Sequence, residues 1–505
     1  MPRLPWLGLP SLRWVGTPTA QHKPVEGLVL AGGGSRASFQ LGALRYLYDH
    51  TDMHPTVMVG TSAGSILTAA LSQHADRDDQ AAAARSLEEL WLAMRDPDQM
   101  FQPRPWFSRL QERSSDWMEL MATESSRPEP RRTLPRLNVL GRSPEVPDDP
   151  EERAVEVSEL TGQALTLKLA MEDPAPQTNG FSPSMVMPLL SMLPRLRSAG
   201  SDLSLILRGA DASRSMYHPG ALLTRLLDTD VFQSGAVALS GVTVRLATVA
   251  LESGELRFMT ETGDLVDRNN VPVPGPSHDL SLGVLASCSI PAVFPPVLIG
   301  DEWYVDGGIR ENTPAEMAIG HLGVDRCYVL VSSPTEKPRA DSFESQSMLN
   351  VIMRTSEIMG DETERDEVAY ARSAGALVIE PELFVHDPMT VEGGLLRINR
   401  DYGWLRAIEA HQKLPESTSR LHRRIIERRL DAHRVEREYL TTSPLTAARQ
   451  SEDTLRELTR LKFRIRDDLA QLSAHQLPAD AQEWWRSWET HTEPVPRRAA
   501  WLSPL

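Results

Sequence analysis

A glycine-rich turn near the start of the chain constrains the fold more than any other segment. The stretch LVLAGGGSRASFQLGAL, residues 28–44, opens with an apolar run that ends in Gly32, Gly33 and Gly34, and apolar residues then recur at helical spacing. A strand, a glycine turn and a helix N-terminus form an anion site, because unpaired N–H groups and the helix dipole point the same way. Three anions fit: a dinucleotide pyrophosphate, a nucleoside triphosphate, or a charge that exists only in a transition state.

Size and composition are those of a globular protein. The chain has 505 residues, of which 41% are apolar and 24% charged. Its net charge of -16 argues against nucleic acid as the main partner, since phosphate binding needs a positive face. The two cysteines, Cys288 and Cys327, lie in segments with buried character and form no disulfide framework, so we expect a reducing compartment.

The N-terminal stretch MPRLPWLGLPSLRWVG is apolar but interrupted by prolines. It lacks the unbroken apolar core and cleavage site of a signal peptide. No run approaches the roughly 20 apolar residues that span a bilayer. We therefore expect a cytoplasmic protein whose membrane contact, if any, is peripheral.

Strands and helices alternate in the first part of the chain. Residues 25–31 and 56–59 have strand character, while residues 37–50 and those from Ser62 onward have helical character. Strands that are apolar throughout and alternate with helices predict a parallel sheet covered on both faces. Later runs predict a hairpin at residues 252–255 and strands at residues 303–305, 326–334 and 376–381.

The pattern divides the chain into four parts. We expect an N-terminal extension at residues 1–24, a main α/β domain at residues 25–410 and a helical C-terminal region at residues 411–505. Within the domain, residues 103–230 are rich in Pro, Ser and Arg and predict a long, partly disordered insertion.

Two segments stand out by their apolar or basic character. Residues 184–197, SMVMPLLSMLPRLR, predict either a methionine-rich lid helix or a helix packed on the core. Residues 420–437 contain seven arginines, which suit docking on anionic lipid. Interspersed acidic residues favour a solvated, self-pairing helix instead.

Two of the three anions are disfavoured by missing residues. A triphosphate loop needs a lysine after its glycines, and none follows here. Gly32, Gly34 and Ala37 satisfy the dinucleotide pattern G-x-G-x-x-[G/A]. However, the second strand ends in Gly60 and not in the acidic residue that would hold the ribose.

The second turn carries the motif G-x-S-x-G, formed by Gly60, Ser62 and Gly64 between a strand and a helix. Such a tight turn projects the serine hydroxyl above the sheet. The motif is common by chance as a surface turn, but this one lies 28 residues after Gly34, on the adjacent strand-to-helix turn. Both turns lie at the carboxyl ends of strands, where open α/β sheets bind ligands.

If Ser62 is a nucleophile, the glycine turn can bind the oxyanion that its attack creates. Attack on an ester places negative charge on the carbonyl oxygen, and each preorganised N–H donor contributes about 3–4 kcal/mol in other enzymes. Gly32, Gly33 and Gly34 are the candidate donors. Arg36 either adds positive potential or is a solvated residue at the helix start.

The candidate base is Asp306 in WYVDGGIRENTP, which closes a strand and is followed by Gly307 and Gly308. A carboxylate becomes basic enough for this task when burial raises its pKa. Asp-Gly is also a common turn pair. A Ser-His-Asp esterase would use His321 or His386, but neither lies in a glycine-flanked turn after a strand.

This order of motifs resembles the patatin-like phospholipase family, and specifically a bacterial-type lipid acyl hydrolase. SFQLGAL, TVALESGELRFM, ASCSIPAVFPPV and YVDGGIRENTPAEMAI resemble further family segments, over residues 25–110 and 230–335. The resemblance implies an α/β three-layer sandwich with a mostly parallel sheet. It also implies a dyad of Ser62 and Asp306 that needs no metal or organic cofactor. One departure is Ala37, where the family usually has glycine.

The resulting hypothesis is a lipid acyl hydrolase that forms an acyl-enzyme on Ser62. Its partner is a lipid or lysolipid substrate, and phospholipid, lysophospholipid and acylglycerol esters all fit. The oligomeric state stays open. Ala37 and the long insertion also permit a non-catalytic lipid-binding or scaffolding relative, and a Ser-His-Asp esterase is a lesser alternative.

Overall fold

The computed structural model describes residues 24–109, 214–228, 231–334, 348–441, 448–473 and 476–477. The predictions for the N-terminal extension, for most of the insertion and for the lid candidate at residues 184–197 lie outside these residues. So does the end of the C-terminal region.

A nine-stranded sheet forms the centre, in the order β11-β10-β1-β2-β5-β6-β7, with β9 paired to β5 and β8 to β9. Strands β11, β10, β1, β2 and β5 run parallel to one another, whereas β6 and β9 pair antiparallel with β5, β7 with β6, and β8 with β9. The strands are β1 Glu26–Leu30, β2 Val57–Gly60, β5 Thr243–Ala250, β6 Leu256–Thr260, β7 Leu265–Asp267, β8 Val297–Ile299, β9 Glu302–Asp306, β10 Arg326–Leu330 and β11 Leu377–Ile379. A separate two-stranded sheet joins β3 Phe101–Pro103 to β4 Tyr217–Pro219. The predicted mostly parallel sheet is confirmed.

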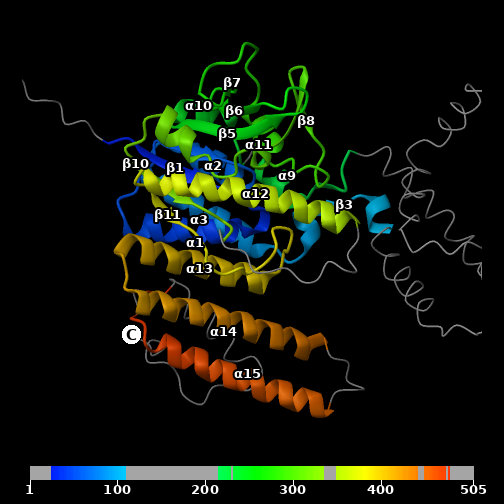
Figure 1. Ribbon diagram of the computed structural model, residues 1–505, viewed down its shortest axis with the longest axis vertical. Coiled ribbons are helices and arrows are strands. Elements are labelled where there is room, and N and C mark those ends of the chain that lie inside the picture. Colours follow the sequence, from blue (N-terminus) through cyan, green and yellow to red (C-terminus); the bar gives the residue numbers. More distant parts are fainter. Residues whose placement is uncertain are drawn as a thin grey trace, which may run out of the picture.

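Helices cover both faces of the sheet (Figure 1). Alternate residues of β1 enter different apolar clusters: Leu28 and Leu30 pack with α1, α2, α3, α11 and α13, and Val29 packs with the chain around residue 317 and with α12. The helices are α1 Ala37–His50, α2 Ala63–Ser72, α3 Arg77–Ala93, α9 Ala221–Leu226, α10 Ser234–Ser240, α11 Leu280–Ser287, α12 Met348–Ser373, α13 Gly393–Gln412, α14 Glu416–Thr441 and α15 Ala448–Leu469. The architecture is therefore the predicted three-layer α/β sandwich.

The local predictions for the first half of the sheet are confirmed to within a residue or two. The helix expected at residues 37–50 is α1, and Ser62 directly precedes α2. The hairpin expected at residues 252–255 connects β5 to β6. Helix α13 belongs to the main core, within the domain expected to end near residue 410, and α14 and α15 follow in the region expected to be helical.

Helices α1 and α13 pack unusually closely because each has a glycine at the contact. A Cβ at Gly42 of α1 would collide with the carbonyl oxygen of Arg400, and a Cβ at Gly403 of α13 would collide with that of Phe39. Beside this contact, the Phe39 and Tyr402 rings meet edge to face at 5.6 Å. The helix that follows the glycine turn is thus held against the core over much of its length.

The arginine-rich stretch at residues 420–437 pairs with acidic residues. All seven arginines have a carboxylate within 4 Å: Arg420, Arg423, Arg424, Arg428, Arg429, Arg434 and Arg437. Asp401 of α13 and Asp468 of α15 are among the partners, so the pairs tie α14 to both neighbouring helices, which lie beside it in Figure 1. Arg420, Arg423 and Arg434 pair within α14, as the self-pairing interpretation expected, whereas the other four arginines pair with acids outside this helix. In the described part of the chain, no helix has the length and apolarity required to cross a bilayer.

The glycine contact between α1 and α13 predicts a specific loss of stability. Gly403→Ala should lower the free energy of unfolding by about 1–3 kcal/mol, because the added methyl group must push two backbones apart. Urea unfolding measures this change. Gly360→Ala is the matched control, because an added Cβ there meets nothing within 4 Å on helix α12. The control should be neutral or stabilised by up to about 1 kcal/mol; equal effects in the two variants would contradict the packing account.

Candidate active site

Two strands that end at the same edge of β5 bring Ser62 and Asp306 together. Strand β2 runs parallel to β5 and ends with Gly60 opposite Leu246. Strand β9 runs antiparallel along the continuation of that edge and ends with Asp306 opposite Thr248. The carboxyl ends of β2 and β9 therefore meet, although they lie far apart in the sequence.

Ser62 occupies a strained turn between β2 and α2. Its φ of 53° and ψ of -127° are uncommon for a residue with a side chain, and they match the elbow that presents a nucleophile. A Cβ at Gly60 would collide with the Thr68 hydroxyl, and one at Gly64 would collide with the Leu30 carbonyl oxygen. Both predicted motif glycines are therefore required for α2 to start this close to the sheet.

The peptide groups of Ser62 are held by side chains at the end of α11. The Ser62 N–H donates to Ser287 Oγ at 2.9 Å, and the Ser62 carbonyl accepts from the Cys288 thiol at 3.3 Å. The N–H of Ser65 also donates to that carbonyl, at 2.8 Å. The sequence motifs did not reveal these supports. Their only signal was that Ser287 and Cys288 fall in a segment, ASCSIPAVFPPV, that resembles the family.

Asp306 is a buried carboxylate with one oriented oxygen. It is 5% exposed, and its Oδ1 accepts the Gly308 N–H at 2.8 Å. Burial raises its pKa from 3.8 to about 7, while the nearby Ser62 hydroxyl and the Gly308 N–H lower it in part. Oδ2 makes no hydrogen bond of ordinary geometry with the described residues. Gly307 fits directly against β5, where a Cβ would lie 2.6 Å from the Ala247 carbonyl oxygen.

The glycine turn offers two N–H groups and not three. The Gly32 N–H donates to the Asn312 carbonyl at 3.1 Å, so it is already engaged. Among the described residues, no acceptor binds the N–H groups of Gly33 and Gly34. Gly34 has a φ of 56°, which favours glycine, and lines the same cavity as Ser62. The set of candidate oxyanion donors is thus narrowed to Gly33 and Gly34.

Arg36 and Ala37, which follow Ser35 after the turn, adopt ordinary helical backbone geometry. The half-buried Arg36 folds back toward the turn, with its Nε 3.5 Å from the Gly33 carbonyl oxygen, and is not a freely solvated residue. Ala37 is fully buried and has a φ of -57°. An alanine at this position therefore causes no backbone strain, and its methyl group packs in the core.

An apolar cavity lies over Ser62. Its walls come from β3, α9 and the loop after α11, and they include Phe101, Leu223 and Phe294. Helix α9 belongs to the stretch expected to be an insertion, and its contribution to the cavity was not predicted. The cavity is apolar but small, with a volume of about 30 Å³.

No histidine of the described residues hydrogen-bonds to Ser62 or Asp306. His386 is buried beside the glycine turn, where burial lowers its pKa to about 4, and its Nδ1 lies 2.9 Å from the Asp387 carbonyl oxygen. His321 ends the short helical turn Met317–His321. The described part of the chain therefore offers no imidazole for a Ser-His-Asp triad. It also holds no group of three or more His, Cys, Asp or Glu side chains arranged for a metal ion.

Comparisons with known proteins identify the class to which this fold and site belong. The model of the family described as "Patatin-like phospholipase" matches residues 28–319, more than half of the chain. The chain belongs to the patatin-like phospholipase family, and the resemblance expected from the motifs is confirmed. Membership places it among lipid acyl hydrolases.

Solved structures give more distant matches. VipD from Legionella pneumophila is 14% identical, with 89% of this chain and 83% of that chain covered and a TM-score of 0.31. The ExoU–SpcU heterodimer of the Pseudomonas aeruginosa type III secretion system is 15% identical, with 94% and 70% covered and a TM-score of 0.23. Likenesses this low carry no argument about function. No curated protein sequence matches the chain.

The raised pKa of Asp306 predicts a pH-dependent stability cost. An acid whose pKa is raised by folding destabilises the protein fully above the folded pKa, and the cost disappears below the unfolded value. Asp306→Asn should therefore increase the free energy of unfolding at pH 8, with a smaller gain at pH 5 and none below about pH 4. Urea unfolding of both proteins across this range measures the difference. A gain that is constant with pH would show that the Asp306 charge is not its source.

Proposed function

We propose that this protein hydrolyses carboxylic ester bonds of phospholipids or related lipids through a Ser62–Asp306 dyad. The observation that carries the proposal is the position of a buried, basic carboxylate at the end of β9, next to a serine on a strained elbow at the end of β2. Family membership supports the lipid acyl hydrolase class. The Ser62–Asp306 dyad and the type of ester are our proposals beyond what family membership supports.

In the proposed first step, Asp306 accepts the Ser62 hydroxyl proton while Oγ bonds to the ester carbonyl carbon. The carbonyl oxygen becomes an oxyanion, which the N–H groups of Gly33 and Gly34 stabilise. Collapse of this intermediate breaks the ester C–O bond, and Asp306 returns its proton to the departing alcohol. Water then attacks the acyl-enzyme with Asp306 again as the base, which releases the fatty acid and restores Ser62.

The pKa of Asp306 suits this chemistry. A base works best when its pKa lies near the operating pH, because it is then both deprotonated and strong enough to attract a proton. A pKa of about 7 meets both conditions, whereas an exposed aspartate near 3.8 is a far weaker base. The burial that costs stability is thus what makes the carboxylate useful.

The apolar cavity over Ser62 supports a lipid as substrate. Leu222, Leu223 and Leu226 of α9 face the cavity together with Phe101 and Phe294, so the lining matches the apolar chain of an ester. At about 30 Å³ the cavity has to widen before an acyl chain enters. We propose that the protein meets its substrate peripherally, at the surface of lipid aggregates. Both Ser62 and Asp306 are at most 6% exposed, so a non-catalytic lipid-binding relative is the second candidate.

The dyad predicts that two single substitutions abolish hydrolysis. Ser62→Ala and Asp306→Asn should each reduce fatty acid release from phospholipid vesicles at least about a thousandfold. The two side chains act as a unit, so loss of either one removes most of the rate enhancement that they give together. His321→Ala is the control and should keep wild-type activity. A fluorophosphonate probe should label the wild type but not Ser62→Ala. A wild type that binds vesicles but neither reacts with the probe nor releases fatty acid would instead identify the lipid-binding relative.

The dyad also predicts the shape of the pH profile. Only deprotonated Asp306 can accept a proton, so kcat/KM should rise with pH and reach half of its plateau near pH 7. A soluble short-chain ester, assayed from pH 5 to 9, separates this effect from changes in lipid aggregation. A profile that is flat between pH 5.5 and 8.5 would remove Asp306 as the base.

A further inference from the structure

One residue, Asn312, connects the glycine turn to the Asp306 turn. Its carbonyl accepts the Gly32 N–H at 3.1 Å. Its Oδ1 lies between the two turns: a Cβ at Gly32 would collide with it, and a Cβ at Gly308 would lie 3.0 Å from it. A Cβ added at Gly32 would also lie only 3.1 Å from the Cβ of Ser62. Asn312 therefore acts as a spacer between the turn that bears the oxyanion donors and the turn that bears the base.

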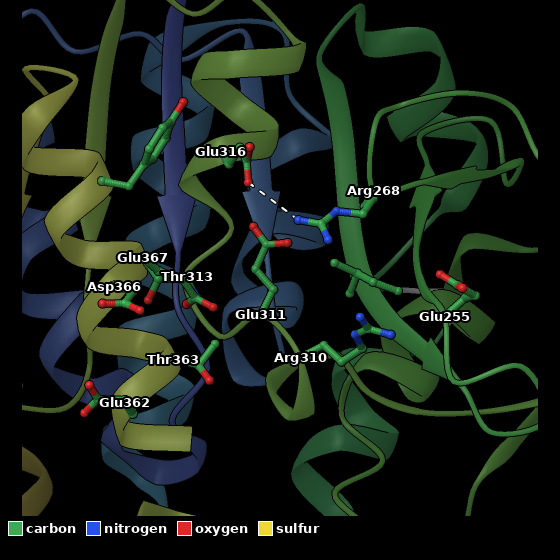
Figure 2. Close-up of a pocket in the computed structure, with 12 residues that line it drawn as sticks. Glu255, Arg268, Arg310, Glu311, Thr313, Glu316, Glu362, Thr363, Asp366 and Glu367 are labelled. Carbon is green, nitrogen blue, oxygen red and sulfur yellow. Dashed lines mark hydrogen bonds and ion pairs between the residues drawn. The ribbon is translucent and has the colours of Figure 1, made fainter. Parts of the chain in front are cut away.

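Two carboxylates of helix α12 hold this spacer. Asn312 Nδ2 donates to Glu364 Oε1 at 2.8 Å. Glu367 accepts the N–H of Asn312 at 3.3 Å and that of Thr313 at 2.6 Å. Figure 2 shows Glu367 beside Thr313, where α12 faces the loop across an acidic groove. Glu364 and Glu367 are three residues apart, so both lie on one face of α12.

The bond to Glu364 is well suited to fix a position. Glu364 is 6% exposed, and a buried carboxyl group needs hydrogen-bond partners that replace water. The loop after Asp306 is thereby attached to α12, a 26-residue helix packed on the sheet. Rigid elements, not loop residues alone, thus set the place of Asn312.

We infer that Asn312 is a positioning residue for the proposed reaction and that Glu364 acts through it. The inference rests on the proposed function, because Gly33 and Gly34 are useful only if their N–H groups are in place before the oxyanion forms. Gly32 directly precedes these donors. The Asn312 main-chain carbonyl binds the Gly32 N–H, and the Asn312 side chain anchors that carbonyl through Glu364. Without this anchor the carbonyl can move and both donors shift with it, and a shift of about 1 Å can cost about a hundredfold in rate.

Steady-state kinetics of the full-length protein test the inference. Asn312→Ala and Glu364→Ala should lower kcat roughly 10- to 100-fold with KM within about threefold, since substrate contacts are retained. Glu364→Gln keeps an oxygen that accepts from Asn312 and should stay within about threefold of wild type. Glu362→Ala, an exposed position on the same helix, is the control and should leave kcat unchanged.

Amide hydrogen exchange tests the same tie without relying on activity. Exchange in a peptide covering residues 31–36 should rise in Asn312→Ala and Glu364→Ala but not in Glu362→Ala, at an unchanged thermal unfolding midpoint. The inference is overturned if both alanine variants keep wild-type kcat and exchange, if their loss follows global unfolding, or if Glu364→Gln is as impaired as Glu364→Ala. An inactive wild type would refute the proposed function, and the exchange data would still decide whether α12 holds the turn.

Discussion

The site depends on one edge of strand β5, where a parallel and an antiparallel neighbour end two residues apart. Strand β2 stops opposite Leu246 and β9 stops opposite Thr248, so backbone ladders place Ser62 and Asp306 in one small region. Side chains alternate between the faces of a strand, and a slip of one residue would move Asp306 to the other face. The site therefore forms only when β9 pairs with β5 in this register. The side chains of the sheet core, which fix the register, thus also determine the position of Asp306.

Desolvation is the second condition, and it acts on stability and chemistry in opposite directions. Taking the Asp306 carboxylate out of water destabilises its charged form, which makes the folded protein less stable above neutral pH and makes the carboxylate a better base. The chain tolerates this cost because apolar clusters cover both faces of the sheet. Active sites commonly retain such unfavourable groups, and the surrounding fold offsets them.

Local patterns in the sequence predicted most of the elements and motif residues, because periodicity and turn chemistry act over a few neighbours. Helix α1 and the elbow at Ser62 are examples. Contacts between distant segments left no such signal. The acceptor of the Gly32 N–H is Asn312, 280 residues further along, and it changed which glycines can serve as oxyanion donors. Helix α9 is a six-residue element, too short for its apolar spacing to indicate that it lines the cavity.

In the proposed dyad, the backbone orients the base, a task that a third side chain performs in a Ser-His-Asp triad. An imidazole needs a partner to fix its tautomer, whereas a carboxylate needs only a donor on one oxygen. The Gly308 N–H is that donor: it binds Oδ1 of Asp306 and leaves Oδ2 without a hydrogen bond. Gly307 allows the turn to lie against Ala247, where a side chain would collide with β5. The two glycines after the aspartate thus explain how a site can work with two side chains, because the strand edge and the turn supply the remaining constraint.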